Sequence, residues 1–165
     1  MTDQRSAPGI VVRGEQAEKL SIGPQTTWLF AEGADTGGAF SAIRAKLAPG
    51  ADGARPHHHA RASEMFFVIA GAVDVLVGEE IVAVQAGDVV VANAGTMHAF
   101  ANGSASDAAD ILIVFGPAIE RFDYFRLLQR VVSGQATIAD VLASQERFDN
   151  WFGESPAWSA RGRQA

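Results

Sequence analysis

The fold of this chain is decided by two stretches, Pro56-His57-His58-His59-Ala60-Arg61-Ala62-Ser63-Glu64 and Gly87-Asp-Val-Val-Val-Ala-Asn-Ala-Gly-Thr-Met-His98-Ala-Phe-Ala-Asn102. All four histidines of the chain fall inside them. In an extended strand alternate residues share a face, so His57 and His59 can point the same way while His58 points away. We therefore expect His58 to lie at the surface or behind the site.

Glu64 has the wrong parity to share that face on an unbroken strand, because it follows His57 by seven residues. The intervening Ala60–Ser63 must contain a bend if Glu64 is to reach the same pocket. His98 follows the turn-forming Asn93-Ala94-Gly95. Three imidazoles and one carboxylate are thereby predicted to converge.

A cluster of this kind suits a divalent transition metal ion: Fe, Mn, Ni, Co, Cu or Zn. The chain has no cysteine, so any metal must bind through nitrogen and oxygen. Four protein ligands leave one or two positions open to water or substrate, which is typical of a catalytic site rather than a structural one. The alternative is a metal-free polar cluster of the same residues.

Short runs rich in Val, Ile and Phe, separated by Gly, Pro, Asn and Asp, surround the two stretches. Many short strands with turns between them favour an antiparallel sandwich or barrel. The expected strands are Ile10–Arg13, Thr26–Ala31, Ala39–Leu47, Glu64–Ala70, Val73–Val77, Ile81–Gln85, Asp88–Ala92, His98–Ala101 and Ile111–Phe115.

The pattern becomes helical after Pro117. Apolar residues recur at helical spacing from Glu120 to Val132, and Thr137 with Asp140 forms a capping-box signal for a second helix. We expect a flexible tail over 1–8, a β-barrel over 9–116, helices over 117–152 packed on the barrel or on a dimer partner, and an irregular tail over 153–165.

The net charge and the distribution of basic residues indicate which classes of binding partner to expect. The formal net charge is −6 and the Lys and Arg residues form no run, which argues against a nucleic-acid or anionic-membrane surface. The first residues lack the apolar stretch of a signal peptide, and no run is long enough to span a membrane. We expect a cytoplasmic protein that binds a small molecule.

Together the two stretches resemble the paired motifs of the cupin superfamily. His57, His59, Glu64 and Gly71 match the first motif, and Gly87, Gly95, His98 and Asn102 match the second, each at the family's spacing. Two positions depart from the pattern, since Ala51 replaces the opening Gly and Asn93 replaces a Pro. Both concern turn geometry, and all four ligand positions are intact.

The resemblance implies an all-β double-stranded β-helix (a jelly-roll barrel) with a short C-terminal helical extension, a metal held by His57, His59, Glu64 and His98, and a homodimer. Small quercetin dioxygenase-like cupins are the members it is most similar to. The implied function is oxygenation of an aromatic or enolic small molecule, with Glu64 as ligand and possible catalytic proton acceptor. Two alternatives stay open: a redox-neutral polyketide cyclase or isomerase, and a binding module without turnover.

Other side chains have a structural and a functional interpretation. Arg44 and Lys46 alternate on a predicted strand, and we expect them to be outward solvated charges rather than an anion site. A further set can line a pocket beside the metal or pack in the core, and packing is the default. Its members are Trp28, Phe30, Phe66, Met97, Phe100 and Phe115.

Overall fold

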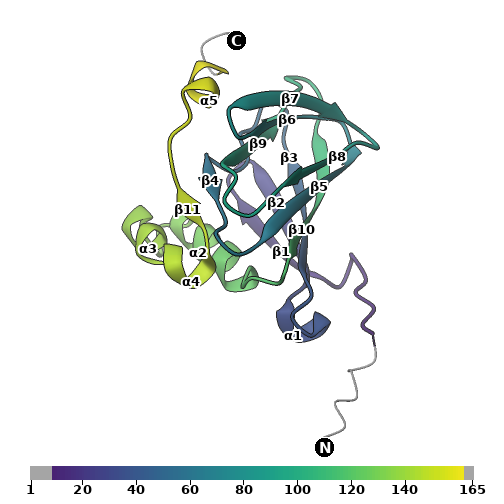
Figure 1. The fold of residues 1–165 in the computed structure, drawn as a ribbon. Coiled ribbons are helices and arrows are strands. Elements are labelled where there is room, and N and C mark those ends of the chain that lie inside the picture. The colour runs from purple at the N-terminus through teal and green to yellow at the C-terminus, as the bar shows by residue number, and fades with distance from the viewer. Residues whose placement is uncertain (1–8, 162–165) are drawn as a thin grey trace, which may run out of the picture.

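The computed structural model describes residues 9–161, so the expected 1–8 tail lies outside the described residues. Two antiparallel sheets wrap around a common core (Figure 1). The first sheet has the order β1 (Glu18–Ile22), β2 (Gln25–Ala31), β3 (Ser41–Leu47), β10 (Ala109–Gly116), β5 (Ser63–Ala70) and β8 (Val89–Ala92). The second has the order β11 (Trp151–Phe152), β4 (His57–His58), β9 (His98–Asn102), β6 (Ala72–Val77) and β7 (Glu80–Gln85). The predicted jelly-roll fold with a C-terminal helical part is confirmed.

Side-chain alternation decides which face of each strand enters the core. On β5, Glu64, Phe66 and Val68 are buried while the residues between them are more exposed. Burying a side chain such as Phe66 contributes roughly 1.5–3 kcal/mol. The same alternation carries the polar Glu64 inward at the start of the strand, where it needs partners.

Three differences from the predicted strands have a common cause. Ile10–Arg13 forms no strand, and Val11 is 77% exposed, because no neighbouring strand pairs with this segment. By contrast β4 and β11 are strands of two residues each that form through pairing with distant segments: β11 pairs with β4 across 93 to 95 positions, and β4 also pairs with β9. Strand propensity alone therefore predicts a strand that does not form and misses two that do, because pairing partners decide both outcomes.

Two motif glycines sit at turns that need positive φ. Gly71 joins β5 to β6 with φ 79°, and Gly87 precedes β8 with φ 96°. A Cβ on Gly71 would lie 2.5 Å from the carbonyl oxygen of Ala108, whereas a Cβ on Gly87 would meet open space. Only glycine satisfies both demands at position 71.

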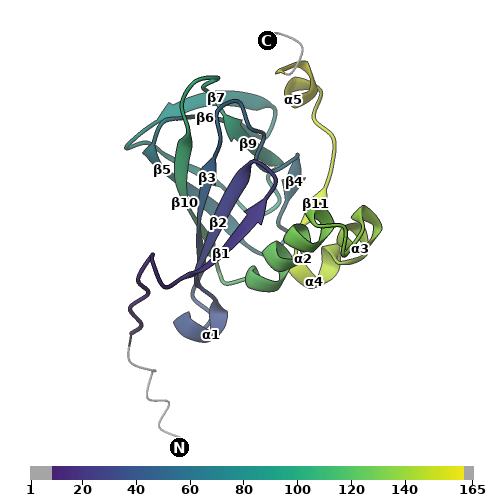
Figure 2. The same cartoon turned by 180° about the vertical axis from the view of Figure 1, so that it is seen from behind.

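The helices are α1 (Gly33–Thr36), α2 (Phe122–Val132), α3 (Ile138–Ala143), α4 (Gln145–Phe148) and α5 (Pro156–Arg161), and Figure 2 shows α2 to α4 grouped beside β1 and β2. Thr137 and Asp140 form the predicted capping box of α3. The second predicted helix is interrupted at Ser144, so it becomes α3 and α4. Glu32 holds the start of α2 on the barrel, since its Oε1 accepts the amide hydrogens of Arg121 at 2.7 Å and Phe122 at 2.6 Å.

The expected irregular tail over 153–165 is wrong for its central part, which forms α5. Tertiary contacts account for this helix, because Arg161 donates to the Asp74 carboxylate at 2.9 Å and to the Asn102 carbonyl at 3.2 Å. Residues 162–165 lie outside the described residues. Among residues 9–161 no helix is both long and apolar enough to cross a membrane.

Candidate metal centre

The two sheets bring the four predicted ligand residues to one place inside the barrel. His57 lies on β4 directly opposite His98 of β9. Ala60 and Arg61 form the predicted bend after His59, which lets Glu64 enter from β5 in the other sheet. Both sheets therefore contribute to the cluster.

The cluster is compact and almost sealed from solvent. Each residue offers one ligand atom, and these atoms all lie within 4.8 Å of one another. Glu64 Oε2 is 2.6 Å from His98 Nε2, 2.9 Å from His59 Nε2 and 3.9 Å from His57 Nε2. No member is more than 4% exposed. His58 is outside this group, as strand parity predicts.

Backbone carbonyls orient all three imidazoles. The Nδ1 of His57 lies 2.7 Å from the Arg55 carbonyl, and that of His98 lies 2.8 Å from the Thr96 carbonyl. His59 Nδ1 pairs with the Asp149 carbonyl. A carbonyl oxygen only accepts, so each Nδ1 carries the hydrogen and each Nε2 faces the centre.

Mutual charges shift the pKa values within the cluster. Burial opposes ionisation of Glu64, but His98 and His59 more than compensate and hold the pKa of this carboxyl well below its usual range. Burial lowers the pKa of His98, but the charge and hydrogen bond of the Glu64 carboxylate raise it by more. The net shift of the His98 pKa is therefore upward. Burial and the neighbouring His98 depress the pKa of His57 strongly. The low pKa of Glu64 keeps this residue as a carboxylate, which is the form that binds a cation.

These four residues can hold a divalent metal ion. Three Nε2 atoms and one carboxylate oxygen converge on one point. This donor set suits a borderline transition metal ion. Their role as ligands, and any catalytic role of Glu64, stays a prediction.

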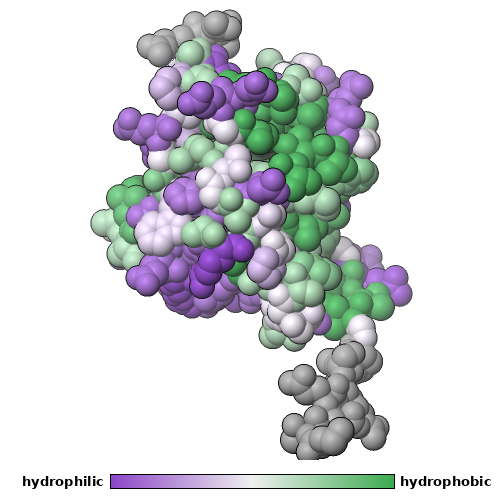
Figure 3. Space-filling view, viewed as in Figure 1, coloured by the Kyte–Doolittle hydropathy of each residue, from purple (hydrophilic) through white to green (hydrophobic). Residues whose placement is uncertain are grey.

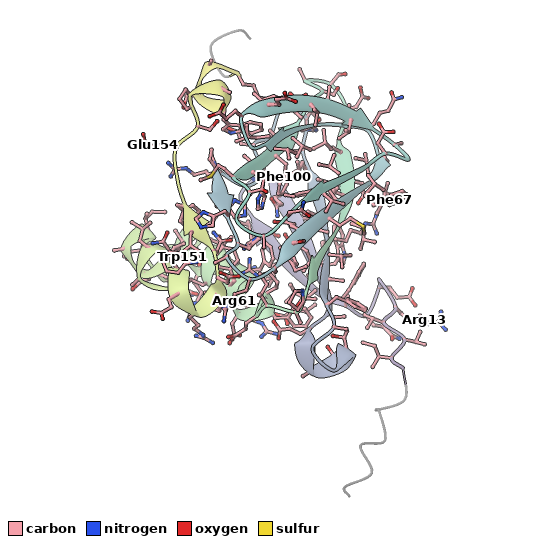
Figure 4. All side chains as sticks on the ribbon, viewed as in Figure 1. Arg13, Arg61, Phe67, Phe100, Trp151 and Glu154 are labelled. Atoms are coloured by element: carbon pink, nitrogen blue, oxygen red, sulfur yellow. The ribbon has the colours of Figure 1, made fainter. Side chains whose placement is uncertain are left out.

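Aromatic rings surround the cluster, and each histidine has one beside it. Figure 4 shows Phe100 inside the barrel and Trp151 on β11 beside the helices. The candidate pocket residues Trp28 and Phe30 instead lie on the outer face of β2, where the Arg44 guanidinium stacks over Trp28 and pairs with Asp110. The ring pairs are Phe152 with His57 at 6.3 Å, Phe115 with His59 at 5.5 Å and Phe66 with His98 at 6.1 Å.

Sequence reasoning missed the C-terminal residues that reach the cluster. Asp149 contacts His59, and the buried Arg121 lies between the rings of Phe115 and Tyr124. No local pattern signals these contacts, because they join segments far apart in the chain. Burial lowers the pKa of Arg121, which has hydrogen bonds to carbonyl and amide oxygens but no carboxylate within ion-pair distance among the described residues.

A comparison with protein-family models agrees with the observed barrel fold. Residues 43–115 match the cupin domain family model. A search of curated proteins found no significant match.

Several solved structures share the fold. KdgF from Halomonas sp. is 23% identical with a TM-score of 0.59, covering 70% of this chain and 98% of its own. A predicted oxalate decarboxylase from Thermotoga maritima is 23% identical with a TM-score of 0.58, covering 66% and 99%. Pac13 from Streptomyces, described as a nucleoside dehydratase, is 14% identical with a TM-score of 0.56, covering 68% and 86%.

At these identities the neighbours establish the fold alone. The family match identifies a cupin domain over residues 43–115, and the neighbours agree with it in fold.

Proposed function

We propose that this chain is a metal-dependent enzyme that oxygenates an aromatic or enolic small molecule. The observation that carries the proposal is the buried set of three Nε2 atoms and one carboxylate that face a common centre, with phenylalanine rings beside the histidines. The apolar enclosure suits a flat aromatic substrate, and exclusion of water strengthens charge interactions inside it.

A bound divalent ion would supply Lewis acidity, and a redox-active one would also supply reactivity toward dioxygen. His57, His59 and His98 hold the site through Nε2, with their rings fixed by the carbonyl contacts at Nδ1. Glu64 completes the set, and its second role is to accept the proton of the substrate hydroxyl. Its depressed pKa makes it a weak base, so it accepts that proton only after moving away from His98.

The test begins with elemental analysis of the purified protein and of His98→Ala, with His58→Ala as the matched control. We expect near-stoichiometric Fe, Mn, Ni, Co or Cu in the wild type and in His58→Ala, and loss of metal in His98→Ala. Oxygen uptake is then measured with a panel of flavonols and catechols. Absence of metal after reconstitution would overturn the proposal.

The redox-neutral alternative gives a different result at the same site. The proteins of similar fold include a dehydratase and a predicted decarboxylase, and one fold hosts many chemistries. A cyclase or isomerase would tolerate Zn²⁺ and turn over without consuming oxygen. If the protein binds a ligand but does not convert it with or without oxygen, a binding module without catalytic activity is the remaining function.

A further inference from the structure

The segment Phe148–Trp151, called the C-terminal clasp below, reaches from α4 to the candidate metal centre. Within it the Asp149 carbonyl accepts the Nδ1 hydrogen of His59, a contact across 90 positions of sequence. The other two histidines are oriented by carbonyls only two residues before them. His59 is therefore the one histidine of the cluster whose Nδ1 partner comes from the C-terminal segment.

The Asp149 side chain fastens the clasp to the loop that follows His59. Its carboxylate accepts the amide hydrogens of Ala60 at 2.8 Å and Arg61 at 2.9 Å, and the indole hydrogen of Trp151 at 3.2 Å. Asp149 is only 2% exposed. One residue thus holds the backbone beside His59 with its carboxylate and the ring of His59 with its carbonyl.

The backbone at Asp149 is unusual and fits this double role. Its φ of 49° makes it the sole non-glycine residue with positive φ among residues 9–161. An L-residue pays about 1–2 kcal/mol for the left-handed conformation, although Asp and Asn tolerate it better than most. The surrounding contacts must hold it in place.

Those contacts come from both sides of Asp149. The buried Arg121 donates to the carbonyl of Phe148 and, at 3.3 Å, to Oδ1 of Asn150. After the clasp, β11 pairs with β4, and the Gly153 amide donates to the Pro56 carbonyl at 3.1 Å. The segments on either side of the His59 loop are therefore tied to the C-terminal part of the chain.

We propose that Asp149 is a positioning residue that fixes the tautomer and orientation of His59, and that the C-terminal helices thereby control metal affinity. This inference rests on the metal-binding part of the proposed function and not on oxygen chemistry. Hydrogen bonds behind metal-ligating histidines typically change affinity by about 10–100-fold when removed.

The variants are Asp149→Ala, Asp149→Asn and the control Asp140→Ala. Asp140 belongs to the same helical extension and caps α3, but it lies away from the cluster. Asp149→Ala keeps the backbone carbonyl that accepts from His59 but removes the carboxylate that holds this carbonyl beside the His59 loop. We therefore expect it to weaken Co²⁺ binding by about 10-fold, the lower end for a change behind a ligand, and to change the visible d–d spectrum of bound Co²⁺. Asp149→Asn tolerates positive φ but keeps only one of the two acceptor oxygens, so it should restore part of the affinity. Asp140→Ala should bind Co²⁺ as the wild type does.

A second readout uses the metal-free protein. The Nδ1 hydrogen of His59 should give a solvent-protected imidazole NMR signal in the wild type and lose protection in Asp149→Ala. Wild-type affinity, Co²⁺ spectrum and ring protection in a folded Asp149→Ala would overturn the inference. Failure of the wild type to bind Co²⁺ would overturn the proposed function, and the NMR comparison would still decide the role of Asp149.

Discussion

At the scale of single residues, the hydrogen bonds behind the histidines fix how each ring presents its ligand atom. Each Nδ1 is committed to a backbone carbonyl, so each ring presents Nε2 to the centre without a conformational search. Preorganisation of this kind lowers the free-energy cost of binding a cation.

Adjacent histidines give a direct test of this arrangement. We expect His57→Ala to lower Co²⁺ affinity by more than the roughly 10–100-fold that follows from changes behind a ligand. His58→Ala should leave affinity unchanged, because His58 lies outside the cluster. Isothermal titration of both variants measures the difference. Equal losses in the two would contradict the assignment of faces on β4.

Tyr124 offers a spectroscopic reading of the core, since it is the single tyrosine of the chain. Burial raises its pKa to about 12 from an ordinary value of 10.0, with the Arg121 cation opposing the shift. We expect the absorbance at 295 nm to titrate near pH 12 in the native protein and near pH 10 after unfolding. A native midpoint near 10 would mean that the phenol is solvated.

The same shift predicts a loss of stability in alkali. The unfolded chain releases the Tyr124 proton first, so the contribution is fully present below pH 10 and is lost as pH rises to about 12. The loss amounts to roughly 3 kcal/mol in the free energy of unfolding. Chemical denaturation across this range measures it, and Tyr124→Phe should remove this part of the pH dependence.

At the scale of elements, two turns between strands differ in why they need glycine. One reason is a positive φ, and the other is a lack of space for a Cβ atom. Gly71 and Gly87 both have positive φ, but only Gly71 would also place a Cβ against backbone atoms. The contact is with the segment that leads into β10, so it couples the β5–β6 turn to the neighbouring strand.

Alanine at each glycine tests this distinction. We expect Gly87→Ala to cost about 1–2 kcal/mol from backbone strain alone. Gly71→Ala should cost a further 1–3 kcal/mol, roughly, because the backbone must move to admit the methyl group. Urea denaturation provides both values. A smaller loss at position 71 than at 87 would show that the turn relaxes freely.

At the scale of the whole molecule, the homodimer expected from the sequence stays a prediction, and one surface suits it. Phe67, Ile69, Val89 and Val91 form an outer apolar patch on β5 and β8, within the hydrophobic region seen in Figure 3. Val89 and Val91 are 54% and 50% exposed. In the described chain no strand pairs with the outer edge of β8.

A second copy is the occupant that we expect, because face-to-face packing of the two β5–β8 surfaces would cover both patches. Strand β8 itself carries no charged side chain, so contact there would bury no unpaired charge from this strand. We expect a dimer by light scattering and a monomer for Val91→Lys. Val132→Lys, at an exposed position on α2, is the control and should remain dimeric.

The sequence by itself predicted the four residues that cluster and most of the barrel. The spacing of His57, His59 and Glu64, with the parity of a strand, was sufficient to predict a bend within Ala60–Ser63 and the exclusion of His58 from the cluster. Alternating apolar residues predicted most strands, because burial on one face leaves a period of two in the sequence.

Only the tertiary structure decided what holds the ligands in place. The contacts of Asp149 with His59, of Arg121 with the clasp, and of β4 with β11 join segments 27 to 95 positions apart. Single long-range contacts leave no periodic trace, and the positive φ at Asp149 occurs without the glycine that would have signalled it. Ile10–Arg13 shows the reverse, since strong strand propensity produced no strand where the described chain provides no partner.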